Sequence, residues 1–197
     1  MTDRLSPTTL RATWDRVVAE ADRLDQAVYL AVAGTDTPTL DGPISRLSDL
    51  ANYSRLWIGV AGGLALVGGR SGRRSAAAGM VAVGVTSAIA NLGVKSAFRR
   101  RRPDRVHNPE RTTVRMPTST SFPSGHTASA FAFAFGASEV LPWLALPLVP
   151  LAAGVGYSRV HTGVHYPGDV LAGAVLGSVV GSIAPLVLAR PLRRLGR

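Results

Sequence analysis

The stretch Ser158-Arg-Val-His-Thr-Gly-Val-His-Tyr-Pro-Gly-Asp169 stands directly before a long apolar run and contains Arg159, His165 and Asp169. Pro167 suits the first turn of a helix, because its missing N–H would have no partner there. The stretch therefore predicts a helix that begins near Pro167, with His165 just before it and Asp169 one turn inside. A carboxylate at that place can accept a hydrogen bond from one imidazole nitrogen and leave the other free to attack. The alternative is a polar turn between two buried helices.

Uncharged runs on both sides of this stretch decide the fold class. The runs 75–94, 116–138, 140–158 and 170–189 contain 20, 23, 19 and 20 residues without a charge. A helix needs about 20 residues to cross the hydrocarbon layer, so four segments are long enough, and 56–69 is a weaker candidate. A soluble all-α protein is the alternative, but too little chain remains to cover four such helices. We expect an all-α integral membrane bundle of five to six helices.

Composition narrows the class of partner. The chain has no cysteine, which excludes a disulfide framework and a thiolate metal site. It has 22 Lys plus Arg against 12 Asp plus Glu, a net charge of +10. Such a balance can indicate nucleic-acid binding, but the basic residues lie between apolar runs. We therefore expect the bilayer, and no nucleic acid, as a partner of a single membrane-embedded domain, 1–197.

The N-terminal part of this domain differs from the rest. Ser6-Pro7 is a helix start signal, and apolar residues from Leu10 to Ala31 recur at three-and-four spacing. We expect an amphipathic helix in the membrane interface or against the bundle. Glycines and prolines predict a loop over 35–49 and a tight basic turn over 70–74. The domain is thus divided into an amphipathic helix and loop, 1–50, and a core bundle with the active site, 51–197.

A second candidate segment follows the run 75–94. The helix is predicted to continue past Lys95 and to stop before Pro103, which places Lys95 and Arg102 two turns apart on one face. Both side chains could then reach one anion. We interpret the intervening Arg99, Arg100 and Arg101 as a basic cluster that flanks the membrane. Asn91 is interpreted as a hydrogen-bonding residue between helices.

A third segment, Phe122-Pro-Ser-Gly-His126, predicts another helix start. Gly125 lets the backbone come close to a ligand, and the N–H groups of a helix N-terminus bind phosphate. His126 lies in the first turn, where it can face the same ligand. Alternating spans place all three segments at the same membrane face.

Together these residues resemble the type 2 phosphatidic acid phosphatases, which share their site with vanadium haloperoxidases and bacterial acid phosphatases. The family pattern is Lys-x6-Arg-Pro, then Pro-Ser-Gly-His, then Ser-Arg-x5-His-x3-Asp. It is matched without substitution, by Lys95…Arg102-Pro103, Pro123-Ser124-Gly125-His126 and Ser158-Arg159…His165…Asp169. The pattern spans 75 of 197 residues. Membrane members usually have six spans, whereas the first helix here is expected to be amphipathic.

The resemblance implies metal-independent hydrolysis of a lipid phosphate through a phosphohistidine, with no cofactor. His165 would attack phosphorus, Asp169 would fix its tautomer, and His126 would protonate the leaving oxygen and then activate water. Catalysis of phosphoryl transfer depends mainly on positioning and on electrostatic stabilisation of the phosphoryl oxygens. The resemblance implies that the phosphate is bound by Lys95, Arg102, Ser124, Gly125 and Arg159. His161 lies outside the pattern and is interpreted as structural.

Substrate, side of the membrane and rival functions stay open at this point. Polyprenyl phosphates or diphosphates, phosphatidic acid and phosphatidylglycerol phosphate all fit, and a bacterial cell-envelope lipid is favoured. The alternatives are a vanadate-dependent haloperoxidase-like enzyme and a non-catalytic membrane protein that binds anionic lipids. Eleven basic residues on the site side against seven on the other do not decide sidedness. We expect a multi-pass cell-membrane protein with the active site on the extracytoplasmic face.

Overall fold

The computed structural model describes residues 7–105 and 114–194, and within these ranges every regular element is a helix. The all-α prediction is therefore confirmed. The elements are α1 (Pro7–Ala33), α2 (Pro38–Leu50), η1 (Asn52–Ser54), α3 (Arg55–Val67), α4 (Gly69–Ala88), the π-helical turns η2 (Ile89–Val94), α5 (Lys95–Ala97), α6 (Gly125–Ser138), η4 (Pro142–Leu144), α7 (Ala145–His161) and α8 (Pro167–Arg194).

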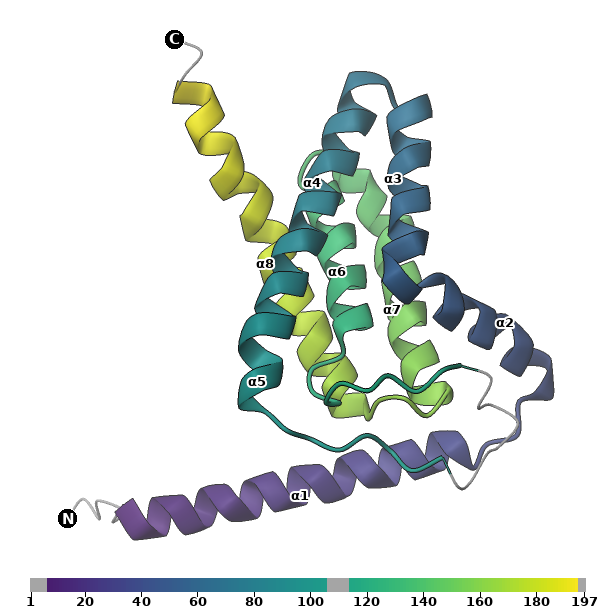
Figure 1. Ribbon diagram of the computed structural model, residues 1–197, viewed down its shortest axis with the longest axis vertical. Coiled ribbons are helices and arrows are strands. Elements are labelled where there is room, and N and C mark those ends of the chain that lie inside the picture. The colour runs from purple at the N-terminus through teal and green to yellow at the C-terminus, as the bar shows by residue number, and fades with distance from the viewer. Residues whose placement is uncertain (1–6, 106–113, 195–197) are drawn as a thin grey trace.

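Helix α6 is the centre of the bundle and packs against α4, α7 and α8 (Figure 1). Its buried face consists mainly of alanine, so neighbouring backbones come close. Phe133 is its large buried side chain and stacks on Trp57 of α3 with ring centroids 5.2 Å apart. Ser75 of α4 also donates a hydrogen bond to the carbonyl of Ala137, at 2.7 Å. The core therefore fixes the position of the α6 N-terminus, where His126 lies.

Two helix starts that the sequence predicts occur where expected. Helix α8 begins at Pro167 and has Asp169 in its first turn. Ser124 is the N-cap of α6, and its hydroxyl accepts a hydrogen bond from the Thr127 amide. The Ser124 amide in turn donates to the carbonyl of Asp169, at 2.9 Å. This bond joins the starts of the two helices directly.

Three local predictions are wrong. Residues 38–50 form α2 and not a loop, because Pro38 occupies the first helical turn, where proline is tolerated. The basic residues of 70–74 lie at the start of α4, and the turn before them is made by Gly68 and Gly69, the latter with φ +58°. The helix through Lys95 ends at Ala97, and Phe98 is already extended.

The bundle contains helices suited to a membrane. In the described ranges, the continuous helix 69–97 and the helix 142–161 are long and apolar enough to span a bilayer, and residues 167–183 of α8 form a shorter apolar segment. Helix α6 has 14 residues, fewer than its uncharged run of 23 suggests. Helix α1 crosses one end of the bundle and contacts α7 and α8 (Figure 1). That end holds the candidate site.

Candidate active site

His165 and Asp169 lie together at the start of α8, both buried. Imidazole Nδ1 is 3.4 Å from carboxylate Oδ2, an ion-pair distance longer than a normal hydrogen bond. The same oxygen accepts the amide N–H of Tyr166 at 3.0 Å and the hydroxyl of Ser121. The amide of His165 donates to the Arg159 carbonyl at 3.1 Å. The predicted carboxylate and imidazole therefore share a rigid corner between α7 and α8.

The other ring nitrogen of His165 faces Arg102. Nη1 of Arg102 lies 3.1 Å from Nε2, and a guanidinium can only donate. Nε2 is therefore the acceptor and Nδ1 carries the proton, on the side of Asp169. Burial lowers the pKa of His165 to about 4, with Arg102 and Arg159 acting in the same direction against the raising effect of Asp169. At neutral pH the ring is uncharged, with a lone pair on Nε2.

Lys95 and Arg102 converge, although not by the route expected. The chain leaves the helix after Ala97, so the two residues do not share a helical face. They meet instead at the hydroxyl of Ser119, 3.5 Å from Nζ of Lys95 and 3.2 Å from Nη2 of Arg102. Arg102 also donates to the carbonyls of Ser119, Thr120 and Val164, which hold its planar group in place.

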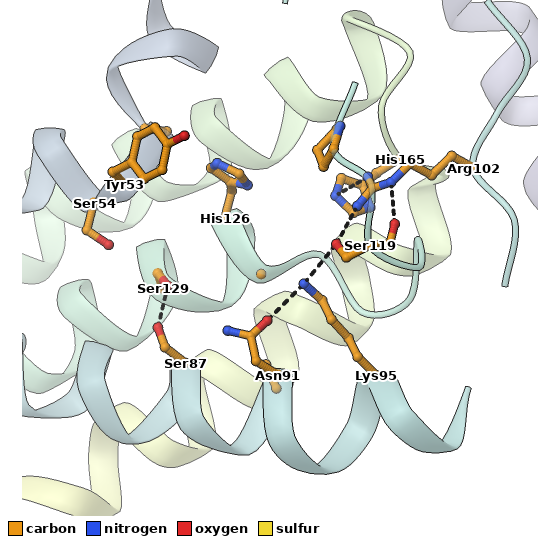
Figure 2. A pocket seen from close by; sticks show the side chains of 14 residues that line it. Tyr53, Ser54, Ser87, Asn91, Lys95, Arg102, Ser119, His126, Ser129 and His165 are labelled. Carbon is orange, nitrogen blue, oxygen red and sulfur yellow. Dashed lines mark hydrogen bonds between the residues drawn. The ribbon is translucent and has the colours of Figure 1, made fainter. Parts of the chain in front are cut away.

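A cavity of about 200 Å³ opens between these groups and α6. Figure 2 shows His126 and His165 lining this one cavity, with Lys95 and Arg102 beside them. Gly125 also lines it, and a Cβ at this position would lie 3.6 Å from Nζ of Lys95. Both histidines thus face a common space that carries two cationic side chains.

His126 is held in the first turn of α6 by a residue from another element. Its Nε2 lies 2.9 Å from Oδ1 of Asn52 in η1. Because the amide oxygen can only accept, Nε2 of His126 carries a proton in this arrangement. Ser124 is fully buried, and its hydroxyl is engaged by Thr127 at 2.9 Å. The structure thus uses the Ser124 side chain as the helix cap, and the hydroxyl is not among the groups that line the cavity.

Arg159 is fully buried on α7 and only partly paired. Its Nη1 donates to the hydroxyl and carbonyl of Ser48 in α2, at 2.6 and 3.3 Å. Its Nε and Nη2 have no hydrogen-bond partner among the described residues. Unsatisfied buried donors on a charged group are costly. Arg159 is not among the residues that line the cavity, although its charge contributes to lowering the pKa of His165.

Several residues of this region were missed or misread in the sequence. Asn52, Ser119 and Ser121 lie in loops or short turns with no periodicity that could indicate them. Asn91 bonds to Lys95 of its own helix, at 3.0 Å, and not to another helix. Arg100, assigned to a membrane-flanking cluster, instead lies 3.0 Å from Asp169. Within residues 7–105 and 114–194, no group of three or more His, Asp or Glu side chains is arranged to hold a metal ion.

Comparison with known proteins gives consistent matches. The profile of the PAP2 superfamily matches residues 75–192. The decaprenylphosphoryl-5-phosphoribose phosphatase of Mycobacterium tuberculosis is 38% identical over 85% of this chain and 92% of its own length. The crystal structure of Aquifex aeolicus LpxE superposes with a TM-score of 0.67 at 26% identity, covering 82% of this chain and 94% of that one. A transmembrane PAP2-type phosphatidylglycerolphosphate phosphatase from Bacillus subtilis shares the fold, with a TM-score of 0.64 at 24% identity and 87% of each chain covered.

The profile covers more than half of the chain and includes the three segments that supply Lys95, Arg102, Gly125, His126 and His165 to the cavity. The mycobacterial relative matches over nearly its whole length. The chain therefore belongs to the PAP2 superfamily.

Proposed function

We propose that this chain hydrolyses a lipid phosphate without a metal ion, through a phosphohistidine on His165, and releases inorganic phosphate. The observation that carries the proposal is the cavity that His126 and His165 share with Lys95 and Arg102. A phosphoryl group in this space would meet an uncharged nucleophile on one side and two cations on another. The partly unpaired guanidinium of Arg159 does not line the cavity, but it is close enough for its charge to lower the pKa of His165.

The proposed first step transfers the phosphoryl group to His165. The lone pair on Nε2 attacks phosphorus in line, and the bond from phosphorus to the lipid oxygen breaks. Burial and the neighbouring cations lower the pKa of His126 and keep it neutral in the empty cavity, so it takes up a proton as the phosphate dianion binds. It then gives this proton to the leaving oxygen, and the lipid leaves as a neutral alcohol or as a shorter phosphate. The positive charge that develops on the His165 ring is offset by Asp169, 3.4 Å away. Lys95, Arg102 and Arg159 stabilise the charge on the transferred oxygens.

The second step reverses the roles. Water enters in place of the lipid, and His126, now neutral, takes one of its protons. The water oxygen attacks phosphorus, the P–N bond to His165 breaks, and phosphate leaves. His165 returns to the neutral form with its proton on Nδ1. The cycle balances with only water consumed.

For the substrate we propose a cell-envelope lipid with a terminal phosphate, a polyprenyl-linked one first. The mycobacterial relative, which matches over most of both chains, is named a phosphatase of a decaprenyl-linked phosphoribose. Other relatives include a lipid A 1-phosphatase from Rhizobium johnstonii and an undecaprenyl-diphosphatase from Sulfolobus acidocaldarius, each over about half of this chain or less. A cavity at the end of a membrane bundle suits a lipid whose headgroup stands at the interface.

The direct test uses protein purified in detergent and a panel of polyprenyl, phosphatidyl and lipid A phosphates. We expect the wild type to release phosphate from at least one of them, and His165→Ala and His126→Ala to reduce the rate to background. His161→Ala is the matched control, because His161 pairs with Asp41 away from the cavity. Full activity in either site variant would contradict the assigned role.

The intermediate separates a phosphatase from a lipid-binding protein. With an aryl phosphate, whose leaving group needs no proton, His126→Ala should accumulate acid-labile phosphoenzyme because water activation is slow. His165→Ala should form none. Orthovanadate should inhibit the wild type and EDTA should not; loss of activity with EDTA would contradict the metal-free mechanism. Halide oxidation with added vanadate would favour the peroxidase alternative.

A further inference from the structure

Arg100 connects the N-terminal helix to the carboxylate beside His165. Its Nη1 lies 3.0 Å from Oδ1 of Asp169 and 2.6 Å from Oδ2 of Asp25, and its Nη2 lies 2.6 Å from Oδ1 of Asp22. The guanidinium also stacks 4.3 Å from the ring centroid of Tyr166. One side chain thus bridges a carboxylate of the site and two carboxylates of α1.

Asp25 has a second contact that points to the same corner. Its Oδ1 accepts the amide N–H of Gly168 at 2.6 Å, in the first turn of α8. A Cβ on Gly168 would lie 2.9 Å from Oδ2 of Asp25, so a larger residue at this position would push the carboxylate away. Asp25 therefore holds the turn that carries Asp169 and, through Arg100, the Asp169 side chain as well.

The two oxygens of Asp169 have separate partners. Oδ2 serves His165, Ser121 and the Tyr166 amide, while Oδ1 is bound by Arg100. Without a partner on Oδ1, the carboxylate could rotate about its last bond and move Oδ2 away from the imidazole. Charge-assisted bonds at both ends of a carboxylate are the usual means of preventing this.

The neighbours of Arg100 differ from it in exposure. Arg99 and Arg101 are exposed, whereas Arg100 is partly buried. Although burial lowers the pKa of Arg100, hydrogen bonds to Asp25 and Asp22 and the charge of Asp169 raise it above the ordinary value for arginine. Neither Arg100 nor any described side chain of α1 lines the cavity.

We propose that Arg100 is a positioning residue, held by Asp22 and Asp25, that fixes Asp169 in the orientation needed by His165. The N-terminal helix is then part of the catalytic apparatus although it contributes no group to the cavity. This inference rests on the proposed function, because it assigns a role in that reaction. It predicts that changes on α1, outside the matched family segment 75–192, alter the chemical step.

The test compares Arg100→Gln and Asp25→Asn with the exposed neighbour Arg99→Gln in the same assay. In Asp25→Asn the amide oxygen could still accept the Gly168 amide, while the amide NH2 would face Arg100, so the substitution removes both the charge and the acceptor for the guanidinium. We expect kcat to fall by about 10- to 100-fold in both site variants, as for other outer partners of reacting groups. KM should stay within about twofold, because neither side chain contacts the cavity. Arg100→Lys should recover part of kcat, since it keeps the charge but not the forked geometry.

A purely structural role would reduce the amount of folded enzyme and leave the pH profile unchanged. In Arg100→Gln we expect the acid limb of kcat/KM to move to higher pH by about one unit, because a positive charge no longer opposes protonation of His165 and Asp169. Inhibition by inorganic phosphate should keep its constant, which shows that the cavity is intact. Wild-type kcat and pH profile in both site variants would overturn the inference.

Failure of the proposed function has a different signature. If the wild type hydrolyses none of the lipid phosphates, the reaction is wrong, and the positioning claim is decided by NMR of ¹⁵N-labelled histidine. Arg100→Gln should then shift the Nδ1 signal of His165 and Arg99→Gln should not. An unchanged signal in Arg100→Gln would overturn the positioning claim independently of turnover.

Discussion

Burial beside two arginines sets the protonation state of His165. Desolvation disfavours the imidazolium and lowers the pKa of the ring, and the charges of Arg102 and Arg159 add to this effect. Asp169 acts in the opposite direction without cancelling them. A neutral nucleophile with its lone pair on Nε2 is the form that attack on phosphorus requires. The surroundings of His165 therefore keep it neutral before a substrate enters the cavity.

The first prediction concerns this pKa. The unfolded chain protonates His165 near pH 6.5, and the folded chain near pH 4. Between these values the unfolded state binds a proton that the folded state does not, so His165 should make the protein less stable as pH falls. ¹⁵N NMR of labelled histidine in detergent should show His165 neutral and protonated on Nδ1 at pH 7. His165→Asn identifies its signal among the four histidines, and a midpoint near 6.5 would contradict the prediction.

At the residue scale the sequence indicated which groups matter but not how they meet. His165 and Asp169 were singled out because a dense cluster of ionisable residues stands beside an apolar run, and His126 because it follows a helix start signal. Arg100 was misread, because its partners Asp22 and Asp25 lie far away along the chain, in a helix judged to be peripheral. Sequence spacing carries no information on such contacts between distant elements.

Helices α6 and α8 make a close backbone contact beside the site. Cβ atoms added to Gly173, Gly177 and Gly181 would lie 2.5, 2.2 and 2.8 Å from carbonyl oxygens of Ser124, Ala128 and Ala132. The three glycines are four residues apart, the small-xxx-small spacing of tightly packed membrane helices. Their contact aligns the α6 start, with His126, against the α8 start, with Asp169.

The second prediction tests this contact. Gly177→Ala should lower the free energy of unfolding by about 1 to 3 kcal/mol, because an overpacked Cβ meets the rigid carbonyl of Ala128. Gly84→Ala is the matched control, since nothing lies within 4 Å of its added Cβ and alanine favours the helix. Thermal unfolding followed by tryptophan fluorescence in detergent measures both. Equal midpoints for the two variants would contradict the packing argument.

Element boundaries were predictable where a cap or a terminal proline marks them. The starts of α6 and α8 are of this kind, with Ser124 as N-cap and Pro167 in the first turn. Helix α2 was mistaken for a loop because Gly34, Pro38, Gly42 and Pro43 interrupt the periodicity, and Pro43 lies inside the helix. Packing compensates for the hydrogen bond that this proline removes, since Leu47 contacts the core and Ser48 binds Arg159. Tertiary contacts of this kind are invisible to local propensity.

At the scale of the whole molecule, several arginines of the site end are engaged inside the fold. Arg100 and Arg102 bind carboxylates, carbonyls and His165, Arg105 binds the carbonyls of Gly163 and Val114, and Arg159 binds Ser48. Lys95 lines the cavity. Because these cationic groups have partners inside the fold or line the cavity, they are poor indicators of how the protein is oriented in the membrane. Without these five, and with Arg11, Arg16 and Arg23 of α1 counted, the described residues still place eight arginines at the site end against six at the other end, so the count alone does not decide the orientation.

The third prediction concerns the side of the membrane that the site faces, and it rests on the charges next to one short connection. Arg70, Arg73 and Arg74 begin α4 next to the short α3–α4 turn, at the end of the bundle away from α1 (Figure 1). Positive charges in short connections favour the cytoplasm, so we expect this turn inside and the site outside, where a cell-envelope lipid would present its phosphate.

The chain has no cysteine, so single cysteines report sidedness without background. Asp36→Cys, in the exposed α1–α2 connection, should react with an impermeant maleimide in intact cells. Val67→Cys, 88% exposed at the other end, should react only after permeabilisation, and the reverse pattern would place the phosphatase site in the cytoplasm.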